Sequence, residues 1–281
     1  MQLSRYYLNL RRLMRRWLGP LALIVLQLRC RFGGDVAVPG GQQCTVVVAS
    51  YLRPKNIQTI INALVKCRFV SEIVISNHNP EIAMADFIES DDERVRILNS
   101  ERREHCGYRF KVTADLRGEY FMILDDDIFM LPEQVRKLFM HLLDDSSVPH
   151  GFHGTRYRSA IDADEITEIQ HIARREAKVD VLHQGYAVTR GQIERMLSIA
   201  EAASRSGQFP DEDPANFADD MMISVSGKAQ PRVHDLAPII TCPTSLQEDV
   251  ACCGRTDFRR LRNRMFSYLR DNVDVSGPAA I

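Results

Sequence analysis

A strand–helix–strand pattern occupies residues 45–76 and limits the folds that this chain can adopt. Residues 45–49 form the β-branched run TVVVA, which is typical of a strand buried on both faces of a sheet. Pro54 favours the start of a helix, and apolar residues then recur three, four, seven and eight positions after Ile57. Residues 73–76 form a second short strand, so the segment predicts two parallel strands joined by a right-handed crossover.

Strands and helices continue to alternate along the rest of the chain. We predict strands at residues 95–98, 120–124 and 179–182, and helices at residues 132–143, 193–207 and 257–269. Residues 120–124 are continuously apolar, which places this strand near the centre of the sheet. The alternation predicts a single-domain α/β fold with a mainly parallel, Rossmann-like sheet and flanking helices.

Composition narrows the class of protein. The chain has 281 residues, of which 45% are hydrophobic and 26% are charged, as is usual for a globular protein. Wholesale disorder, collagen and a multi-pass membrane protein are therefore excluded. The 36 basic and 37 acidic residues give a net charge of −1, so no nucleic-acid partner is expected. The seven cysteines form no CxxC pair, which argues against a zinc ribbon.

The N-terminal segment differs in charge from the rest, since residues 1–34 contain seven arginines and no acidic residue. Residues 17–28 are mostly apolar, but as a helix they would reach about 18 Å, well short of a hydrocarbon core of roughly 30 Å. A basic helix at residues 1–31 that lies on an anionic membrane surface fits this pattern. A signal segment and an ordinary terminal helix stay open. We expect membrane association, peripheral or signal-anchored, on a side that the sequence leaves undecided.

Glycine and proline residues at positions 33–41 predict a linker. We therefore expect a leader and linker at residues 1–43 and one folded domain at residues 44–281.

Three adjacent aspartates, Asp125, Asp126 and Asp127, follow the predicted central strand. Ligands of open α/β sheets bind at the carboxyl ends of the strands, and three carboxylates there need a counter-charge. Alternation along an extended strand would place Asp125 and Asp127 on one side and Asp126 on the other. Such oxygen ligands suit Mn²⁺ or Mg²⁺, which can neutralise a departing diphosphate. A solvated turn that caps the next helix is the alternative interpretation.

A second acidic pair, Asp219 and Asp220, opens an apolar helical turn. A helix cap accounts for one of these aspartates but not for both, so we also consider them as catalytic carboxylates. The chain contains neither a GxxxxGK[ST] phosphate loop nor a GxGxxG fingerprint, so a kinase-like or dinucleotide site is not predicted.

These segments together resemble the C-terminal glycosyltransferase domain of the exostosin family. The resemblance is carried by residues 45–54 and 73–77, the LDDD sequence at 124–127, the pair at 219–220 and Gly227-Lys228. More broadly, the chain is similar to glycosyltransferases of the A-type fold, which bind a nucleotide sugar and a divalent metal. The resemblance implies metal-dependent transfer of a hexose or N-acetylhexosamine from a UDP-linked donor to a glycan or other hydroxyl acceptor.

The resemblance also implies roles for individual residues. Nucleotide-sugar binding is implied for Ser50, Tyr51, Arg53, Asn77, Asn99, Arg109, Asp125, Asp126 and Arg255. Arg255 or Arg259 would clamp the diphosphate, because the arginine fork matches phosphate oxygens. Asp127 would hold the metal, with His234 as a late third ligand, although a structural histidine is an equal alternative. Asp219 or Asp220 would lie beneath the anomeric carbon of the donor as the catalytic carboxylate.

Two other functions remain open at this point. A nucleotidyltransferase would attack at phosphorus, but it usually carries a glycine-rich loop after the first strand, and residues 50–54 contain no glycine. A catalytically silent module that binds a nucleotide sugar or a membrane surface would keep the same residues without turnover. The segment from His183 to Tyr186 is a candidate acceptor loop or a plain turn around Gly185.

Overall fold

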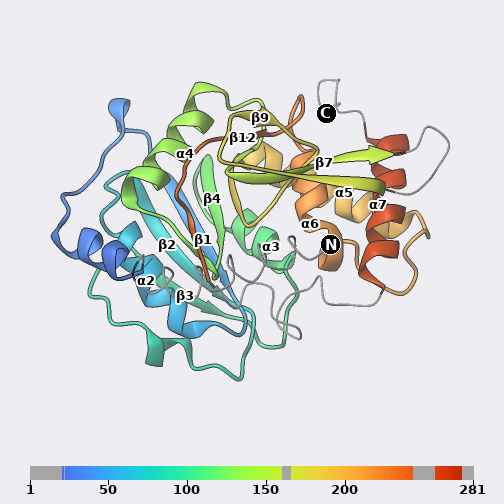
Figure 1. The fold of residues 1–281 in the computed structure, drawn as a ribbon. Coiled ribbons are helices and arrows are strands. Elements are labelled where there is room, and N and C mark those ends of the chain that lie inside the picture. The colour runs from blue at the N-terminus through green and yellow to red at the C-terminus, as the bar shows by residue number, and fades with distance from the viewer. Residues whose placement is uncertain (1–20, 22, 160–165, 243–256, 274–281) are drawn as a thin grey trace, which may run out of the picture.

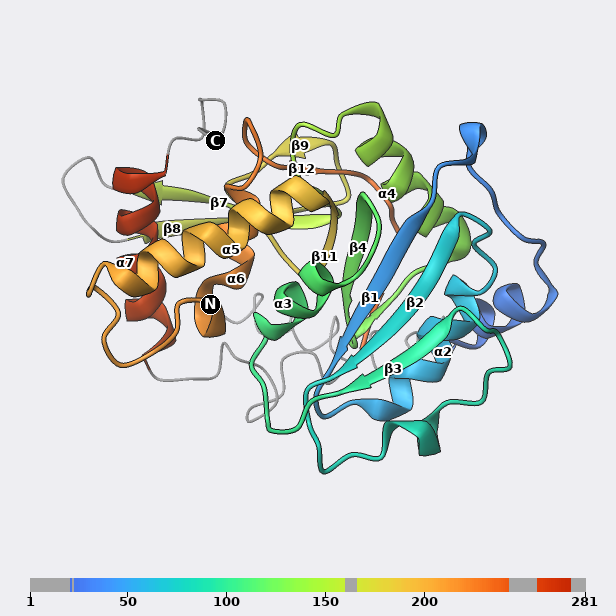
Figure 2. The ribbon, with the colours of Figure 1, turned by 180° about the vertical axis from the view of Figure 1, so that it is seen from behind.

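The computed structural model describes residues 21, 23–159, 166–242 and 257–273. An eight-stranded mixed sheet runs through the centre of the molecule, and helices cover both of its faces (Figures 1 and 2). The order of its strands is β3 (Val95–Asn99), β2 (Val70–Asn77), β1 (Cys44–Ser50), β4 (Tyr120–Asp125), β11 (Gly185–Thr189), β6 (His150–Gly151), β12 (Arg232–Val233) and β9 (Ala177–Lys178). The first four strands are parallel, and β11 runs antiparallel to β4. The predicted α/β fold with a mainly parallel sheet is therefore confirmed.

Alternation along the central strands divides the core in two. Val47 of β1 packs into one apolar cluster, whereas Val46 and Val48 pack into the other. The first cluster includes residues of α3 (Tyr108–Asp115), α5 (Arg190–Arg205), α6 (Ala215–Ser224) and α7 (Phe258–Asn272). The second includes residues of α2 (Pro54–Leu64) and α4 (Pro132–Asp144). Both faces of the sheet are thus buried in apolar cores, which explains why the strands are continuously apolar.

Smaller elements complete the fold. A three-stranded sheet contains β10 (Val181–Leu182), β7 (His153–Ser159) and β8 (Ile166–Ala173). The short strands β5 (Ile128–Phe129) and β13 (Ile240–Thr241) pair antiparallel, and 3₁₀ turns lie at η1 (Pro39–Gly41) and η2 (Met84–Phe87). The predicted strand at 179–182 corresponds to β10, and helices α2, α4, α5 and α7 lie where the periodicity predicted them.

Part of the N-terminal segment packs onto the domain. Residues 23–32 are helical, and Leu26 and Cys30 on this helix are buried in the second core. Val36 then exchanges backbone hydrogen bonds with Lys66 and Arg68. Packed structure therefore extends N-terminal to Cys44. Among the described residues, no helix combines the length and apolarity that crossing a bilayer requires.

Candidate active site

The parallel strands bring their carboxyl ends to one edge of the main sheet, where several predicted site residues lie. Ala49 of β1 is level with Asp125 of β4, and Ser50 is level with Asn77 of β2. Asn77 is in turn level with Asn99 of β3. Because ligands of open α/β sheets bind at this edge, register alone gathers these residues where a nucleotide would bind.

The two asparagines contact each other directly. Nδ2 of Asn77 donates to Oδ1 of Asn99 at 2.9 Å and to the backbone oxygen of Ile82 at 2.9 Å. Oδ1 of Asn77 accepts from the backbone N–H of Asn79 at 3.2 Å. The Asn77 amide therefore holds the loop after β2, and its contact with a nucleotide stays a prediction.

Asp126 fixes the loop that follows β1. Its carboxylate accepts from the backbone N–H of Tyr51 at 3.2 Å and from Nη1 of Arg53 at 2.9 Å. Nδ2 of Asn56 donates to its backbone oxygen at 2.8 Å. Burial raises the pKa of Asp126, while the guanidinium of Arg53 opposes that rise. The arrangement joins the aspartate run to the predicted nucleotide loop.

The expected alternation of the three carboxylates is wrong in one respect. The strand ends at Asp125, and Asp126 and Asp127 form a turn, so extended geometry does not continue through the run. Nη1 of Arg53 lies 2.9 Å from Asp126 and 3.8 Å from Asp127, whereas Asp125 pairs with Arg109. Asp126 and Asp127 thus share one counter-charge, and Asp125 has another.

Asp127 is the residue of this site whose surroundings fit a cation. Its side chain is only 7% exposed, and its Oδ1 is buried without a hydrogen-bond partner. Burial and then the neighbouring Asp125 raise the pKa of Asp127 to about 7. A buried carboxylate oxygen that lacks a donor carries a desolvation cost that a bound cation removes. Hard oxygen ligands of this kind suit Mn²⁺ or Mg²⁺.

Arg109 links the two acidic centres. This buried residue of α3 donates from Nε and Nη2 to Oδ2 of Asp219 at 3.1 and 2.7 Å, and from Nη1 to Asp125. Its guanidinium lies 5.1 Å from the centre of the Tyr186 ring and 5.3 Å from that of Phe110. One fork therefore neutralises two carboxylates that come from segments about 94 residues apart in the chain. The predicted residues Arg109, Asp125 and Asp219 form a single cluster.

Asp220 belongs to a second ion-pair network. The helix α6 is kinked at Ala218. Asp219 and Asp220 are therefore the first residues of the helical segment after the kink, as the sequence predicts. Oδ1 of Asp220 accepts from Nη1 of Arg262 at 2.6 Å, and Oδ2 lies 3.0 Å from Nδ1 of His183. Burial raises the pKa of Asp220, but the guanidinium of Arg262 outweighs this and holds the pKa below its usual value. Asp220 is therefore ionised at neutral pH.

The remaining two predicted residues do not join these clusters. Arg255 lies outside the described residues. His234 lies beyond β12, where its Nδ1 is 2.5 Å from Oε2 of Glu176 and its ring stacks on His141. Burial and His141 lower the pKa of His234 to about 4, so it is neutral at pH 7. Asp127 shares no three-residue metal-ligand group with it in the part of the chain that the structure describes.

Three residues of these networks were not predicted as site residues. They are Arg262, which holds Asp220; Tyr186, which lies beneath Arg109; and Cys106, whose Sγ is 3.4 Å from Asp219. Arg262 adjoins the buried stripe of α7, but the sequence offers no way to choose it among the arginines at positions 259, 260, 262 and 264. Tyr186 and His183 were predicted only as the two ends of a segment that forms an acceptor loop or a turn.

Comparison with solved structures supports the fold. The chain is similar to a crystal structure of GalNAc-T7 with UDP, GalNAc and Mn²⁺, with a TM-score of 0.53 and 11% sequence identity. The similarity covers 73% of this chain and 44% of that one, so the chain spans less than half of its neighbour's length. At this low sequence identity, the similarity is evidence for the fold only. No curated protein matches the chain.

Comparison with family models supplies the assignment. The glycosyl transferase family 2 model matches residues 45–198, which is just over half of the chain. The matched region contains the three aspartates and ends before Asp219. The A-type glycosyltransferase fold predicted from the sequence is thereby confirmed, whereas the more specific exostosin resemblance is not. On this match, the chain belongs to glycosyl transferase family 2.

Proposed function

We propose that this chain is a metal-dependent glycosyltransferase that uses a UDP-linked hexose or N-acetylhexosamine as donor and a hydroxyl group as acceptor. The observation that carries this proposal is the buried Oδ1 of Asp127, which lacks a partner at the carboxyl edge of the sheet. The structural neighbour was crystallised with UDP, GalNAc and Mn²⁺, so UDP and UDP-GalNAc are the first ligands to test.

Each group has a distinct task in this mechanism. Asp127 would hold Mn²⁺ or Mg²⁺, which when bound supplies positive charge beside a departing diphosphate. The loop that Asp126 fixes, with Tyr51 and Arg53, binds the nucleoside. Asp125 and Arg109 orient the sugar. The guanidinium of Arg109 also reduces the electrostatic repulsion between the carboxylates of Asp125 and Asp219.

We propose that Asp220 accepts the proton that the acceptor hydroxyl loses during transfer. The side chain of Asp219 is 5% exposed and is ion-paired with Arg109. The side chain of Asp220 is 13% exposed and contacts His183, whose side chain is 21% exposed. Asp220 is ionised at neutral pH and can accept a proton, while the pairing with Arg262 that lowers its pKa makes it a weaker base than an unpaired carboxylate. The loop with His183 therefore lies on the solvent side of this carboxylate, where an acceptor can approach.

The donor site is tested by titrating UDP onto the full chain by calorimetry, with and without Mn²⁺. We expect Mn²⁺ to strengthen UDP binding in the unaltered protein, and Asp127→Asn to abolish that gain. The matched control is Asp115→Asn, an exposed aspartate at the end of α3, which should leave the gain intact. Metal-dependent UDP binding that survives in Asp127→Asn would overturn the assignment of the metal to this residue.

The same variant gives a readout without ligands. In the folded protein the pKa of Asp127 is about 7, whereas in an unfolded chain it is about 3.9. Between these values, unfolding releases a proton, so this group destabilises the fold increasingly as the pH rises. Without metal, the melting temperature of Asp127→Asn should equal that of the unaltered protein near pH 4 and should be higher than it at pH 8. Equal differences at both pH values would contradict the buried, uncompensated carboxylate.

Turnover distinguishes the three candidate functions. A glycosyltransferase releases UDP from a UDP-sugar when an acceptor is present, while a nucleotidyltransferase releases pyrophosphate from a nucleoside triphosphate. A silent module binds the nucleotide sugar and releases neither. Screening UDP-linked hexoses and N-acetylhexosamines for UDP release identifies the donor class.

Membrane association through the N-terminal helix is also part of the proposal. Leu21, Ile24, Val25, Leu28 and Phe32 are 48–75% exposed and recur at helical spacing, opposite the buried Leu26 and Cys30. The seven arginines of residues 1–34, without any acidic residue, complement an anionic lipid surface. The helix would lie between the protein core and the lipid headgroups.

Sedimentation with vesicles tests this association on the full chain. We expect binding to phosphatidylcholine vesicles that contain 30% phosphatidylserine, with weaker binding to pure phosphatidylcholine and at high salt. Leu28→Glu should reduce the binding at least about tenfold, because the substitution places a charge on the apolar face. Leu52→Glu, at an exposed leucine in the loop between β1 and α2, is the control. Equal binding of both variants would exclude the helix as the contact.

A further inference from the structure

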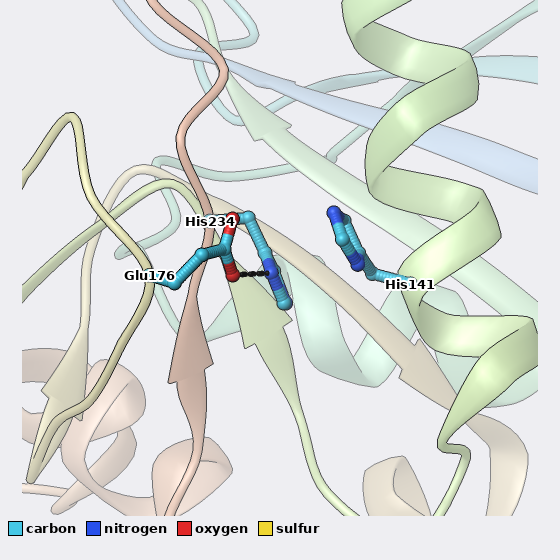
Figure 3. A group of neighbouring side chains, drawn as sticks. All are labelled: His141, Glu176 and His234. Carbon is cyan, nitrogen blue, oxygen red and sulfur yellow. Dashed lines mark hydrogen bonds and ion pairs between the residues drawn. The ribbon is translucent and has the colours of Figure 1, made fainter.

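Apart from the aspartate edge, one group of side chains in the described residues has the composition of a metal site. His141, Glu176 and His234 each offer one ligand atom, and these atoms all lie within 4.8 Å of one another. Figure 3 shows His141 reaching from α4 towards His234, which contacts Glu176 on its other side. The three residues come from separate elements: α4, the connection between β8 and β9, and the segment after β12. None of them contacts the three aspartates through a hydrogen bond or ion pair.

The hydrogen bonds of His150 determine which nitrogen of His234 carries the proton. Nε2 of His150 lies 2.6 Å from the backbone oxygen of Asp145, which can only accept, so this nitrogen must donate. Nδ1 of the neutral His150 ring is then an acceptor, and it lies 2.8 Å from Nε2 of His234. Nε2 of His234 must therefore donate, which leaves Nδ1 of His234 with an unprotonated lone pair.

That lone pair faces a second acceptor. Nδ1 of His234 lies 2.5 Å from Oε2 of Glu176, while Oε1 of Glu176 accepts from the backbone N–H of Asp235 at 3.0 Å. A neutral imidazole nitrogen and a carboxylate oxygen repel each other at this distance unless a positive charge lies between them. A proton or a metal ion can supply that charge. The one N–H of the neutral ring is directed at His150, so Nδ1 of His234 and Oε2 of Glu176 are arranged as two lone-pair ligands of a metal ion.

The third side chain supplies another nitrogen. The ring of His141 stacks on that of His234 with centroids 3.6 Å apart and planes 8° apart. Within the described ranges, no hydrogen bond engages the ring nitrogens of His141, so the ring is able to turn towards a shared ion. Glu176, whose side chain is 61% exposed, provides an entry path from solvent.

We propose that His141, Glu176 and His234 bind one Zn²⁺ ion, separate from the cation expected at Asp127. Two imidazoles and one carboxylate form a donor set that zinc accepts, with the fourth position open to water on the Glu176 side. His150 then acts as the outer partner, since it fixes the ring orientation of His234 as metal-bound histidines usually require. Binding needs a small outward movement of Glu176, because a metal between N and O ligands separates them by more than their present contact.

The ion would join α4 to two segments that the pairing of β12 with β9 already holds side by side. The segment after His234 continues to β13, which pairs with β5 immediately after the aspartate turn. The backbone N–H of Cys242 donates to the backbone oxygen of Asp127 at 2.8 Å. A metal bound at His234 would therefore fix the start of the segment that leads to β13, the strand that packs beside the aspartate turn. Its role is structural, and it contributes no ligand to the donor.

Equilibrium dialysis of the full chain against Zn²⁺, after stripping with a chelator, tests the site. We expect His141→Gln and Glu176→Gln to bind one ion fewer per chain than the unaltered protein, or to bind it at least about tenfold more weakly. His171→Gln, at an exposed histidine on β8, is the matched control and should behave as the unaltered protein does. Asp127→Asn should also retain this ion, which separates the result from that of the donor site.

Co²⁺ provides a second, spectroscopic readout of the same site. Bound in place of Zn²⁺, Co²⁺ should give intense visible absorption typical of four-coordinate nitrogen and oxygen ligation, and each of the two variants should lose it. Thermal melting of the metal-free variants verifies that they are folded. Zn²⁺ stoichiometry and Co²⁺ absorption that are the same in His141→Gln, Glu176→Gln and the unaltered protein would overturn the proposal. The result does not depend on UDP, so it stands or falls separately from the proposed transfer reaction.

Discussion

Asp220→Asn is expected to lower the rate of glycosyl transfer by about 10²–10⁴-fold, with UDP binding retained. Asparagine keeps the shape of the side chain and a partner for Arg262 and His183, but it cannot take the proton of the acceptor. Because Asp220 does not contact the expected metal ligand, the affinity for UDP and Mn²⁺ should change little. UDP release from the identified donor, measured at saturating donor and acceptor, gives the rate.

Controls within the same helix and loop make this result specific. Asp213→Asn alters a half-exposed aspartate just before α6 that pairs with Lys111 on the surface, so it should leave the rate within about twofold. His183→Asn keeps Asp220 but removes the ring at its solvent side, and it should lower the rate less than Asp220→Asn does. If Asp220→Asn is folded and transfers sugar at the normal rate while Asp219→Asn does not, the proton acceptor is Asp219 instead.

Arg109→Met is expected to give the largest loss of stability, about 3–5 kcal/mol. The substitution keeps most of the volume of the side chain but leaves Asp125 and Asp219 close together without their shared counter-charge. For a domain of this size, such a loss corresponds to a fall of roughly 10 °C in melting temperature. The deficit should shrink at acid pH, because protonation of Asp125, whose pKa burial raises, removes one of the two uncompensated charges.

The matched control for Arg109→Met is Arg103→Met. Arg103 pairs with Glu81 on the surface, where both side chains are more than half exposed, so its removal should cost less than about 1 kcal/mol. Arg109→Lys keeps the positive charge without the fork and should fall between the two. A melting temperature of Arg109→Met within 2 °C of the unaltered protein would show that Arg109 does not compensate the pair.

Strong periodicity explains why much of the fold was predictable. The run at residues 45–49 and the helix after Pro54 have unambiguous patterns, and both were found where expected as β1 and α2. The helix α3 was not predicted, since residues 108–113 alternate polar and apolar side chains in the manner of a strand. Tertiary packing overrides that pattern, because Phe110 and Val112 are buried in the core and Arg109 is buried against two carboxylates.

The site was predictable to the extent that strand ends determine it. Asp125 and Asn77 were identified because each ends a strand of the parallel sheet, where ligands bind. The partners of Asp220 could not be identified, since His183 and Arg262 lie 37 and 42 positions away and pair only in the folded chain. The turn at Asp126 likewise ended the alternation that the sequence suggested, since strand termination depends on the pairing of its neighbours.

The register of the parallel strands restricts which insertions and deletions this protein can tolerate. Removing one residue from β1 would exchange the side chains of Val46, Val47 and Val48 between the two cores, because their directions alternate. It would also shift Ser50 and the loop beyond it by one position against Asp125 and Asn77. Length variation among natural homologues should therefore be confined to connecting loops, while the spacing from the start of β1 to Arg53 stays constant.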